Sequence, residues 1–134
     1  NEDIDYHLAM AKKYQIPLAL LLIVGYPTET RDDYEFTKQW FKDRVETYGY
    51  NNPVKFINLS HPAILENTRL DRDADKLNLE KGKYNTIWIN KDTQITSLER
   101  VQYYKELYTI CKPFNPPQGV RLDGYEILEK LAND

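Results

Sequence analysis

Apolar residues form one unbroken stretch near the amino end of the chain and recur at helical spacing on either side of it. Residues 18–24 are seven consecutive apolar residues. That run is too short to cross a bilayer and is typical of a strand buried on both faces of a parallel sheet. Apolar positions recur every three or four residues over residues 3–15 and 34–48, which predicts a helix before the strand and another after it.

A sharp turn separates this strand from the helix that follows it. Gly25 and Pro27 are turn residues, and residues 30–33 resemble a capping box with Asp in place of Glu. The helix is expected to end at Gly49, and residues 54–59 predict a second strand. A strand, a helix and a strand in succession predict a right-handed crossover with two parallel neighbours, so the carboxyl ends of both strands meet at one edge.

The second half of the chain is more polar. Residues 67–83 carry dense charges of both signs and few apolar anchors, which predicts a solvated excursion with one short helix. Residues 86–90 predict an edge strand or an extended lid. A capping box at residues 96–99 begins a third long helix, and a short last helix begins near residues 123–126. We therefore expect one α/β domain over residues 1–134, with a helix-strand-helix-strand core at 1–66, a charged excursion at 67–95 and carboxyl-terminal helices at 96–134.

Composition places the chain among ordinary globular domains and excludes several functions. Of its 134 residues, 41% are hydrophobic and 29% are charged, with a net charge of -3. Because basic residues are scattered among acidic ones, we expect no nucleic-acid partner, and we expect no membrane partner either. Cys111 is the single cysteine and lies at a core-facing helical position. An internal disulfide and a metal site built from this chain's cysteines are excluded, and a cytoplasmic location is expected.

The residues best placed for chemistry follow the two predicted strands. The sequence contains no phosphate-binding glycine loop, zinc-binding HExxH helix or nucleophile elbow. Gly25 allows the backbone to approach a ligand closely, Glu29 projects from the turn just before a helix, and His61 follows the second strand. Each has an alternative structural role, since Glu29 also favours the helix dipole and His61, before Pro62, also shapes a loop.

Residues 23–37 carry a resemblance to a known family. Their sequence, IVGYPTETRDDYEFT, resembles the I-x-G-x-P-G-E-T-x-x-D-x-x-x-T element of radical S-adenosylmethionine enzymes, and most closely the branch whose members often carry a cobalamin-binding domain. In that family the element is the fifth strand of a barrel, and its turn lines the S-adenosylmethionine pocket. Residues 56–62 and 67–70 resemble the sixth strand and its loop, and residues 96–107 resemble the helix that closes the barrel.

This resemblance implies a partial (β/α) barrel, the carboxyl-terminal portion of a radical S-adenosylmethionine domain. The parent enzyme would use S-adenosylmethionine and a 4Fe–4S cluster to generate a 5′-deoxyadenosyl radical that abstracts hydrogen from a small-molecule substrate, and the branch adds cobalamin as a candidate cofactor. Carried over residue by residue, the cofactor-binding positions are Ile23, Gly25, Tyr26, Pro27 and Glu29, and the substrate-side positions are Asn58 and His61.

Two departures from the family pattern restrict this expectation. Thr28 replaces a glycine, which makes the turn less permissive, and the CxxxCxxC motif that holds the cluster is absent, as are the first four strands. We expect these parts to precede Asn1 in a longer parent, so that the isolated chain is inactive, pairs with the remainder of the barrel and otherwise self-associates through unpaired sheet edges. The alternatives are a non-catalytic α/β binding or interaction module, and a small hydrolase using Glu29 and His61, which lacks a nucleophile motif.

Overall fold

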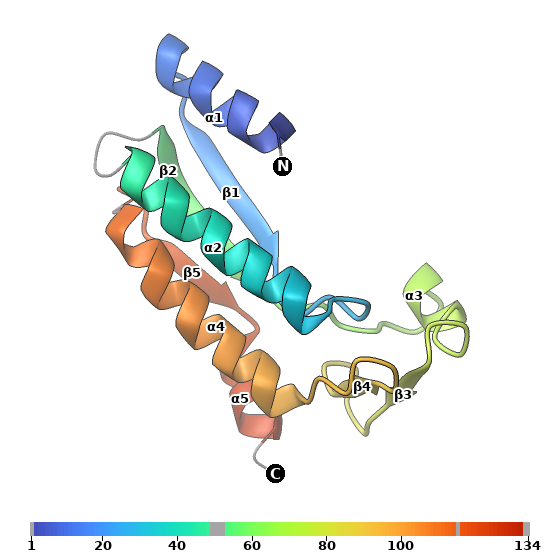
Figure 1. The fold of residues 1–134 in the computed structure, drawn as a ribbon. Coiled ribbons are helices and arrows are strands. Elements are labelled where there is room, and N and C mark those ends of the chain that lie inside the picture. The colour runs from blue at the N-terminus through green and yellow to red at the C-terminus, as the bar shows by residue number, and fades with distance from the viewer. Residues whose placement is uncertain (1, 49–52, 115, 133–134) are drawn as a thin grey trace.

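Three parallel strands and the helices packed on them form the body of the molecule (Figure 1). The computed structural model describes residues 2–48, 53–114 and 116–132 and has a mixed α/β fold. The sheets are β1-β2-β5, which is parallel, and β3-β4, which is antiparallel. In chain order the elements are α1 (Glu2–Tyr14), β1 (Leu18–Ile23), α2 (Arg31–Tyr48), β2 (Val54–Ser60), α3 (Arg69–Arg72), β3 (Leu79–Lys81), β4 (Trp88–Asn90), α4 (Ser97–Cys111), the 3-10 helix η1 (Lys112–Phe114), β5 (Val120–Asp123) and α5 (Tyr125–Ala132).

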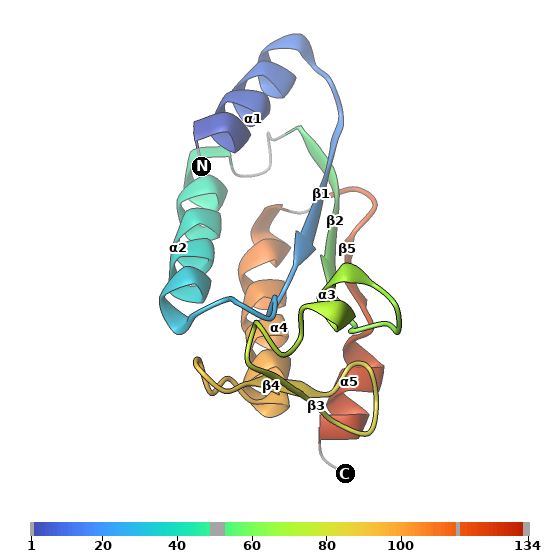
Figure 2. The same cartoon turned by 90° about the vertical axis from the view of Figure 1, so that its right-hand side faces the viewer.

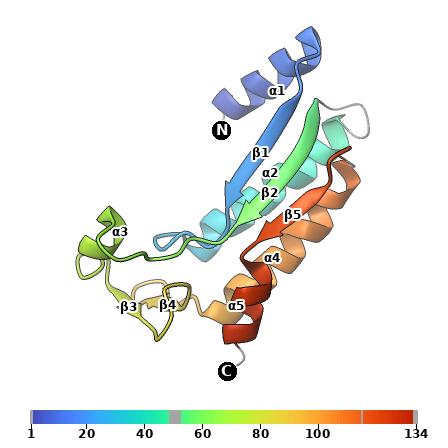
Figure 3. The same cartoon turned by 180° about the vertical axis from the view of Figure 1, so that it is seen from behind.

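The parallel sheet is wound in one direction. The strand β1 pairs with β2 through α2, and β2 pairs with β5 after a longer connection that includes α4. Both α2 and α4 cover the same face of the sheet, which leaves the strands uncovered when the molecule is seen from behind (Figure 3). The predicted crossover between the first two strands is confirmed. The third strand, β5, was not predicted, because its four residues follow a proline-rich stretch and show only a short alternation.

The main core lies between the sheet and the covering helices. In register, Leu20 pairs with Ile57 and Leu22 with Leu59, and all four side chains point toward the helix layer with Phe41. From α4 and α5 the core receives Tyr104, Leu107, Cys111 and Leu128, all buried. Burial of a large apolar side chain contributes about 1.5–3 kcal/mol, so this layer is the principal source of stability.

The face of the sheet that the helices do not cover is called the bare face. The prediction that β1 is buried on both faces is wrong: Leu21 is 72% exposed and Ile23 57% exposed, while Leu20 and Leu22 are partly buried against the core. An unbroken apolar run cannot distinguish one covered face from two. The register places eight residues on the bare face: Ala19, Leu21, Ile23, Phe56, Asn58, Ser60, Arg121 and Asp123.

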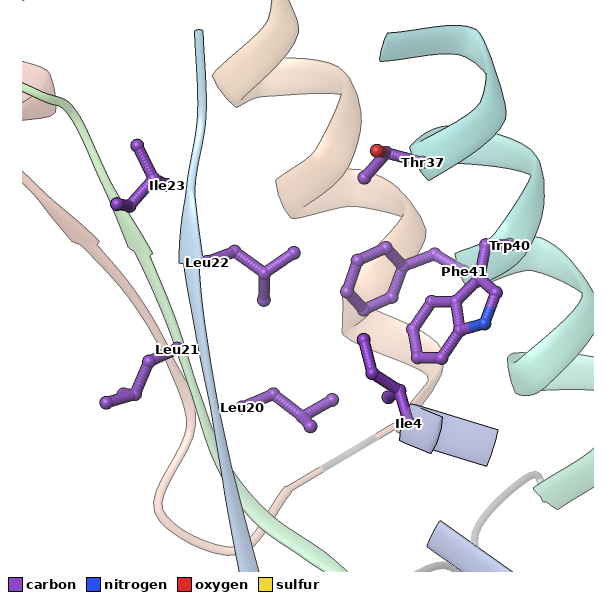
Figure 4. A pocket seen from close by; sticks show the side chains of 8 residues that line it. All are labelled: Ile4, Leu20, Leu21, Leu22, Ile23, Thr37, Trp40 and Phe41. Atoms are coloured by element: carbon purple, nitrogen blue, oxygen red, sulfur yellow. The ribbon is translucent and has the colours of Figure 1, made fainter. Parts of the chain in front are cut away.

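The outer edge of β1 has no strand beside it in the described part of the chain. Next to this edge, Figure 4 shows Leu20 and Leu22 pointing toward Phe41, with Ile4 of α1 close by and Leu21 pointing the opposite way. These side chains line a hollow of about 210 Å³. We call it the edge hollow. It ends the sheet on an apolar surface rather than on the charged or proline residues that commonly protect an edge strand.

A second, smaller folded region, which we call the small unit, comprises residues 61–95 and lies beyond the carboxyl ends of the parallel strands (Figure 2). It contains α3 and the β3-β4 pair around a separate apolar cluster of Ile64, Ala74, Leu79 and Trp88. The expected short helix is present as α3, and residues 88–90 form a strand rather than a lid. The apolar cluster was not predicted, since its members are far apart in a charged sequence.

Both predicted capping boxes are present at the starts of their helices. The side chains of Thr30 and Asp33 hydrogen-bond each other's backbone amides, and Thr96 with Glu99 forms a complete capping box. The first helix, predicted over residues 3–15, spans Glu2–Tyr14. The predicted end at Gly49 falls outside the described residues. In the part of the chain that is described, no helix combines the length and apolarity needed to span a membrane.

Candidate functional site

The turn between β1 and α2 lies at the carboxyl edge of the parallel sheet, where the sequence placed a candidate cofactor site. Gly25 has a φ of +70°, a left-handed conformation that disfavours side chains. Inside the turn, the Glu29 amide donates a hydrogen bond of 2.8 Å to the Tyr26 carbonyl. The preceding Val24 amide donates to the Ser60 carbonyl at 2.8 Å, which ties the turn to the end of β2.

The inner side of this turn is filled by protein. A Cβ atom added to Gly25 would lie 2.6 Å from Cδ of Arg100. Two constraints therefore favour glycine at this position: the positive φ and the close contact with the Arg100 side chain. The buried Pro27 accepts a 2.9 Å hydrogen bond at its carbonyl from Nδ2 of Asn90. Trp88 also lines this side of the turn, where no space remains for a water molecule.

Arg100 is the fully buried residue that supports the turn from α4. Its guanidinium donates to the carbonyls of Ile95 and Trp88 at 3.0 and 2.5 Å and to Oγ of Ser97 at 2.8 Å. The guanidinium carbon lies 3.7 Å from the centroid of the Trp88 ring, a cation–π contact. Burial lowers the pKa of Arg100 to about 10, so the side chain stays charged at neutral pH.

Glu29 points back into the turn. Burial raises the pKa of its carboxyl group to about 7, a hydrogen bond with the Gly25 backbone opposes this rise, and the charge of Asp33 adds to it. One carboxyl oxygen, Oε2, is buried without a hydrogen-bond partner among the described residues. Because Glu29 is partly buried and hydrogen-bonded to the Gly25 backbone, it braces the turn in this structure.

The outer side of the turn is open. Tyr26 is 45% exposed and, with Thr28, borders a hollow of about 760 Å³ between the turn and α3. We call it the rim hollow. The remaining side chains that line it are Thr68, Arg69, Leu70, Asp73, Lys76 and Leu77. A tyrosine ring beside apolar and charged groups can contact a flat, polar-edged molecule.

The two candidates on the substrate side lie in different environments. Asn58 is on the bare face, where its Nδ2 donates to Oδ2 of Asp123 at 2.8 Å and to Oγ of Ser60 at 3.1 Å. His61 packs parallel to Trp88 in the small unit, with ring centroids 6.1 Å apart. The structure therefore places Asn58 on the same face as Ile23 and separates His61 from both.

His61 is held as a neutral imidazole. Its pKa is lowered to about 4, mainly by burial and also by the nearby charge of Arg100, whereas the backbone at Thr86 and Val24 acts in the opposite direction. The Nε2 atom lies 2.9 Å from the Thr86 carbonyl, an acceptor, so Nε2 carries the proton in this pairing. The Nδ1 atom is a buried acceptor with no hydrogen-bond partner among the described residues.

Buried polar atoms that lack a protein partner gather at this end of the sheet. Most buried polar groups in folded proteins are hydrogen-bonded, so each exception marks a place of strain, solvent or ligand contact. Within the described ranges these atoms are Glu29 Oε2, Asn58 Oδ1, His61 Nδ1, Thr86 Oγ1, Arg100 Nε and the Tyr104 hydroxyl. Three of them belong to residues that the sequence had singled out, namely Glu29, Asn58 and His61.

Two supporting residues, Arg100 and Asn90, were missed from the sequence. A signal existed for Arg100: it precedes Tyr104, Leu107 and Cys111 by four, seven and eleven residues, which is the apolar stripe of α4. A charged residue on such a stripe is buried only when it is paired or hydrogen-bonded. No comparable signal identified Asn90, because its partners at residues 27 and 77 are remote in sequence.

The residues of this chain do not fit an iron–sulfur cluster. Such clusters are held mainly by cysteine thiolates, whereas Cys111 lies in the core and burial raises its pKa to about 12. Among the described residues, no group of three or more His, Cys, Asp or Glu side chains could hold a metal ion. Comparisons with protein-family models, curated proteins and solved structures find no match for this chain. A functional assignment therefore depends on the residues and their geometry.

Proposed function

We propose that this chain is the carboxyl-terminal part of a radical S-adenosylmethionine barrel and supplies one wall of the cofactor pocket. The observation that carries the proposal is the position of the Gly25 turn. It follows the edge strand of a parallel sheet that is wound in one direction and covered by helices on one face only. In a barrel the uncovered face is the interior, and active sites lie at the carboxyl ends of the strands.

The proposed division of roles follows the two sides of the turn. Tyr26 and Thr28 face the rim hollow and would contact the adenosine group, together with Ile23 at the end of β1. Gly25, Pro27 and Glu29 would act by holding the turn, since their inner side is packed against the protein. Asn58 lies on the substrate side. The cluster ligands would come from another part of the parent, so no reaction step is assigned to this chain alone.

The direct test is a titration of the chain with S-adenosylmethionine and with 5′-deoxyadenosine, followed by amide chemical shifts. We expect shifts at residues 23–28 and weaker binding of both compounds by Tyr26→Ala. Tyr84→Ala is the matched control, because Tyr84 is comparably exposed on the small unit. Equal binding by both variants, or shifts confined to other regions, would contradict the proposal. The gene upstream of Asn1 offers a second test, because the proposal requires a CxxxCxxC motif there.

The remainder of the barrel is the proposed partner, and the outer edge of β1 is its contact. A strand added in parallel at this edge would satisfy the backbone groups of Leu18–Ile23 and cover the edge hollow. In its absence we expect the isolated chain to self-associate. Light scattering should show a mass above one chain at high concentration, and Ile4→Lys, which places a charge beside the edge hollow on a side chain that is 41% exposed, should restore the monomer. A wild-type mass of one chain would contradict this.

One observation favours a second function. Arg100 occupies the space that the missing side chain of Gly25 leaves, so the glycine is explained without a ligand. A non-catalytic α/β interaction module therefore remains the alternative. It predicts no binding of S-adenosylmethionine or 5′-deoxyadenosine at the turn, and capture of a protein partner through the β1 edge instead.

A further inference from the structure

The bare face carries a cation and an anion that do not pair with each other. Arg121 and Asp123 are two residues apart on β5, about 6.6 Å along the strand, and both are exposed. The Arg121 guanidinium carbon lies 5.1 Å from the Phe56 ring centroid, whereas Asp123 accepts the hydrogen bond from Asn58. Within the described ranges neither residue joins a salt bridge. Arg121 and Asp123 thus each contact a different side chain of β2, Phe56 and Asn58, instead of each other.

Asn58 determines the direction of the acidic group. Its two amide hydrogens are used by Ser60 and Asp123, and the reverse amide orientation would set an oxygen against the Asp123 carboxylate. Among the described residues the second carboxylate oxygen of Asp123 has no partner, so it can accept a hydrogen bond from outside the protein. A fixed carboxylate is a suitable partner for an ammonium group, and the Arg121 fork is a suitable partner for a carboxylate.

The other side of the bare face is apolar. Leu21 pairs in register with Asn58, and Ile23 pairs with Ser60, so exposed aliphatic side chains lie directly beside the polar strand. A sheet face that meets only water is usually polar throughout, and a face packed in a core is apolar throughout. This face is neither: it presents aliphatic groups on β1, amide and hydroxyl groups on β2, and opposite charges on β5.

We propose that the bare face binds an apolar amino acid as a zwitterion. Its ammonium group would contact Asp123, its carboxylate would contact Arg121, and its side chain would lie on Leu21 and Ile23. This inference rests on the proposed function, in which the bare face is the barrel interior. The same chemistry is present in a free amino acid and in the methionine group of S-adenosylmethionine, and the experiment separates these two sources.

The test compares L-leucine with its two halves, 3-methylbutylamine and 4-methylpentanoate, in amide chemical-shift titrations of the chain. L-leucine should shift the amides of Leu21, Asn58 and Arg121. Asp123→Asn, which keeps the acceptor for Asn58, should weaken L-leucine and the amine about tenfold and leave the carboxylate unchanged. Arg121→Met should weaken L-leucine and the carboxylate about tenfold and leave the amine unchanged. The controls lie on exposed positions of α2: Asp32→Asn makes the same change as Asp123→Asn, Lys42→Met removes one positive charge as Arg121→Met does, and both should alter nothing.

The outcomes distinguish this inference from the proposed function. If neither L-leucine nor S-adenosylmethionine is sensitive to Asp123→Asn and Arg121→Met, the zwitterion site is wrong. If S-adenosylmethionine alone responds to both variants and 5′-deoxyadenosine does not, the site stands with the cofactor as its source. If L-leucine responds while S-adenosylmethionine and 5′-deoxyadenosine do not bind, the site stands and the proposed function fails.

Discussion

The body of the molecule and the small unit are built in different ways. The body packs helices on one face of a sheet through a continuous apolar layer that includes Phe41, Ile57 and Leu59. The small unit buries only four apolar residues in its own cluster, and the turn is held at this end by two buried polar side chains, Asn90 of the small unit and Arg100 of α4. The candidate site lies at the boundary between these two regions.

The two regions therefore contribute differently: the apolar body provides most of the stability of the fold, and the polar contacts at the boundary determine the position of the Gly25 turn. An apolar layer holds elements together but tolerates small shifts, because its attraction is not directional. Hydrogen bonds between buried groups depend on distance and angle and therefore fix the position of what they contact. The Gly25 turn extends beyond the apolar body, and the side chains of Asn90 and Arg100 hold it in place. We expect mutations in the body to lower stability most, and mutations at the boundary to change the shape of the turn.

The largest expected effect is in the body. Phe41→Ala removes a fully buried ring from the layer between α2 and the sheet and should lower the free energy of unfolding by about 3–5 kcal/mol. Phe36→Ala on the same helix is the matched control, since Phe36 is 58% exposed, and should change it by about 0.5 kcal/mol or less. Urea unfolding measures both. Similar losses in the two variants would show that the apolar layer is not the main source of stability.

The next effect tests the boundary from the side of the turn. Gly25→Ala places a side chain on a residue with positive φ and within 2.6 Å of Arg100, so both backbone strain and overpacking apply, at a cost of about 2–4 kcal/mol. Gly119 has a φ of +82° with nothing within 4 Å of an added Cβ, and Gly119→Ala should cost only the strain, about 1–2 kcal/mol. Equal losses in urea unfolding would mean that Arg100 moves aside without cost.

A smaller effect is expected from the side of the small unit. Asn90→Ala removes the hydrogen bond to the Pro27 carbonyl and those that Asn90 makes within the small unit, at a cost of about 2 kcal/mol. Hydrogen exchange at the Glu29 amide should become faster than the decrease in the global free energy of unfolding explains. At the Ile57 amide, the change in exchange should match that decrease. The control Asn78→Gly suits the positive φ of Asn78 and removes only an exposed bond to Asp92. An unchanged Glu29 amide would show that Asn90 does not hold the turn.

The same contrast explains what the sequence could and could not predict. Periodicity identified α1, β1, α2, β2 and α4, because each has a face of apolar residues set by contact with the body. It did not identify β5, which is short, or the cluster around Trp88, whose members are distant in sequence. It also overstated the burial of β1, since Leu21 and Leu22 are equally apolar and only the helix layer makes them different.

The sequence predicted where the turn and the neighbouring strand end lie, and only some of the residues that hold them. Turn chemistry identified Gly25 and Pro27, and the crossover rule placed the end of β2 beside them. No pattern in the sequence indicated that His61 would turn toward Trp88 while Asn58 faced Asp123. Asn58 and His61 are only three residues apart, yet their side chains lie in different surroundings. The surroundings of His61 are set by the small unit, whose fold the periodicity of the sequence did not predict.

The last expected effect depends on pH and concerns Glu29. Its folded pKa, about 7, is above the ordinary value of 4.5. As the pH rises from 4.5 to 7, the unfolded chain loses this proton first, so the folded state loses stability, and the loss is complete above about pH 7. Glu29→Gln stays neutral. Its free energy of unfolding, relative to wild type, should therefore be higher at pH 8 than at pH 5 in urea titrations. A difference that does not change with pH would place the carboxyl group in water.

His61 gives the opposite sign and provides an internal check on that measurement. Its folded pKa, about 4, is below the ordinary value of 6.5, so the unfolded chain takes up a proton first as the pH falls from 6.5 to 4, and stability decreases in that direction. The advantage of wild type over His61→Gln should grow as the pH rises through this window, whereas its advantage over Glu29→Gln should shrink. Because both groups lie at the boundary between the body and the small unit, opposite slopes from the two variants require that the small unit is folded against the turn. If Asn90→Ala reduces both slopes together, the burial of both groups depends on the contact that Asn90 makes.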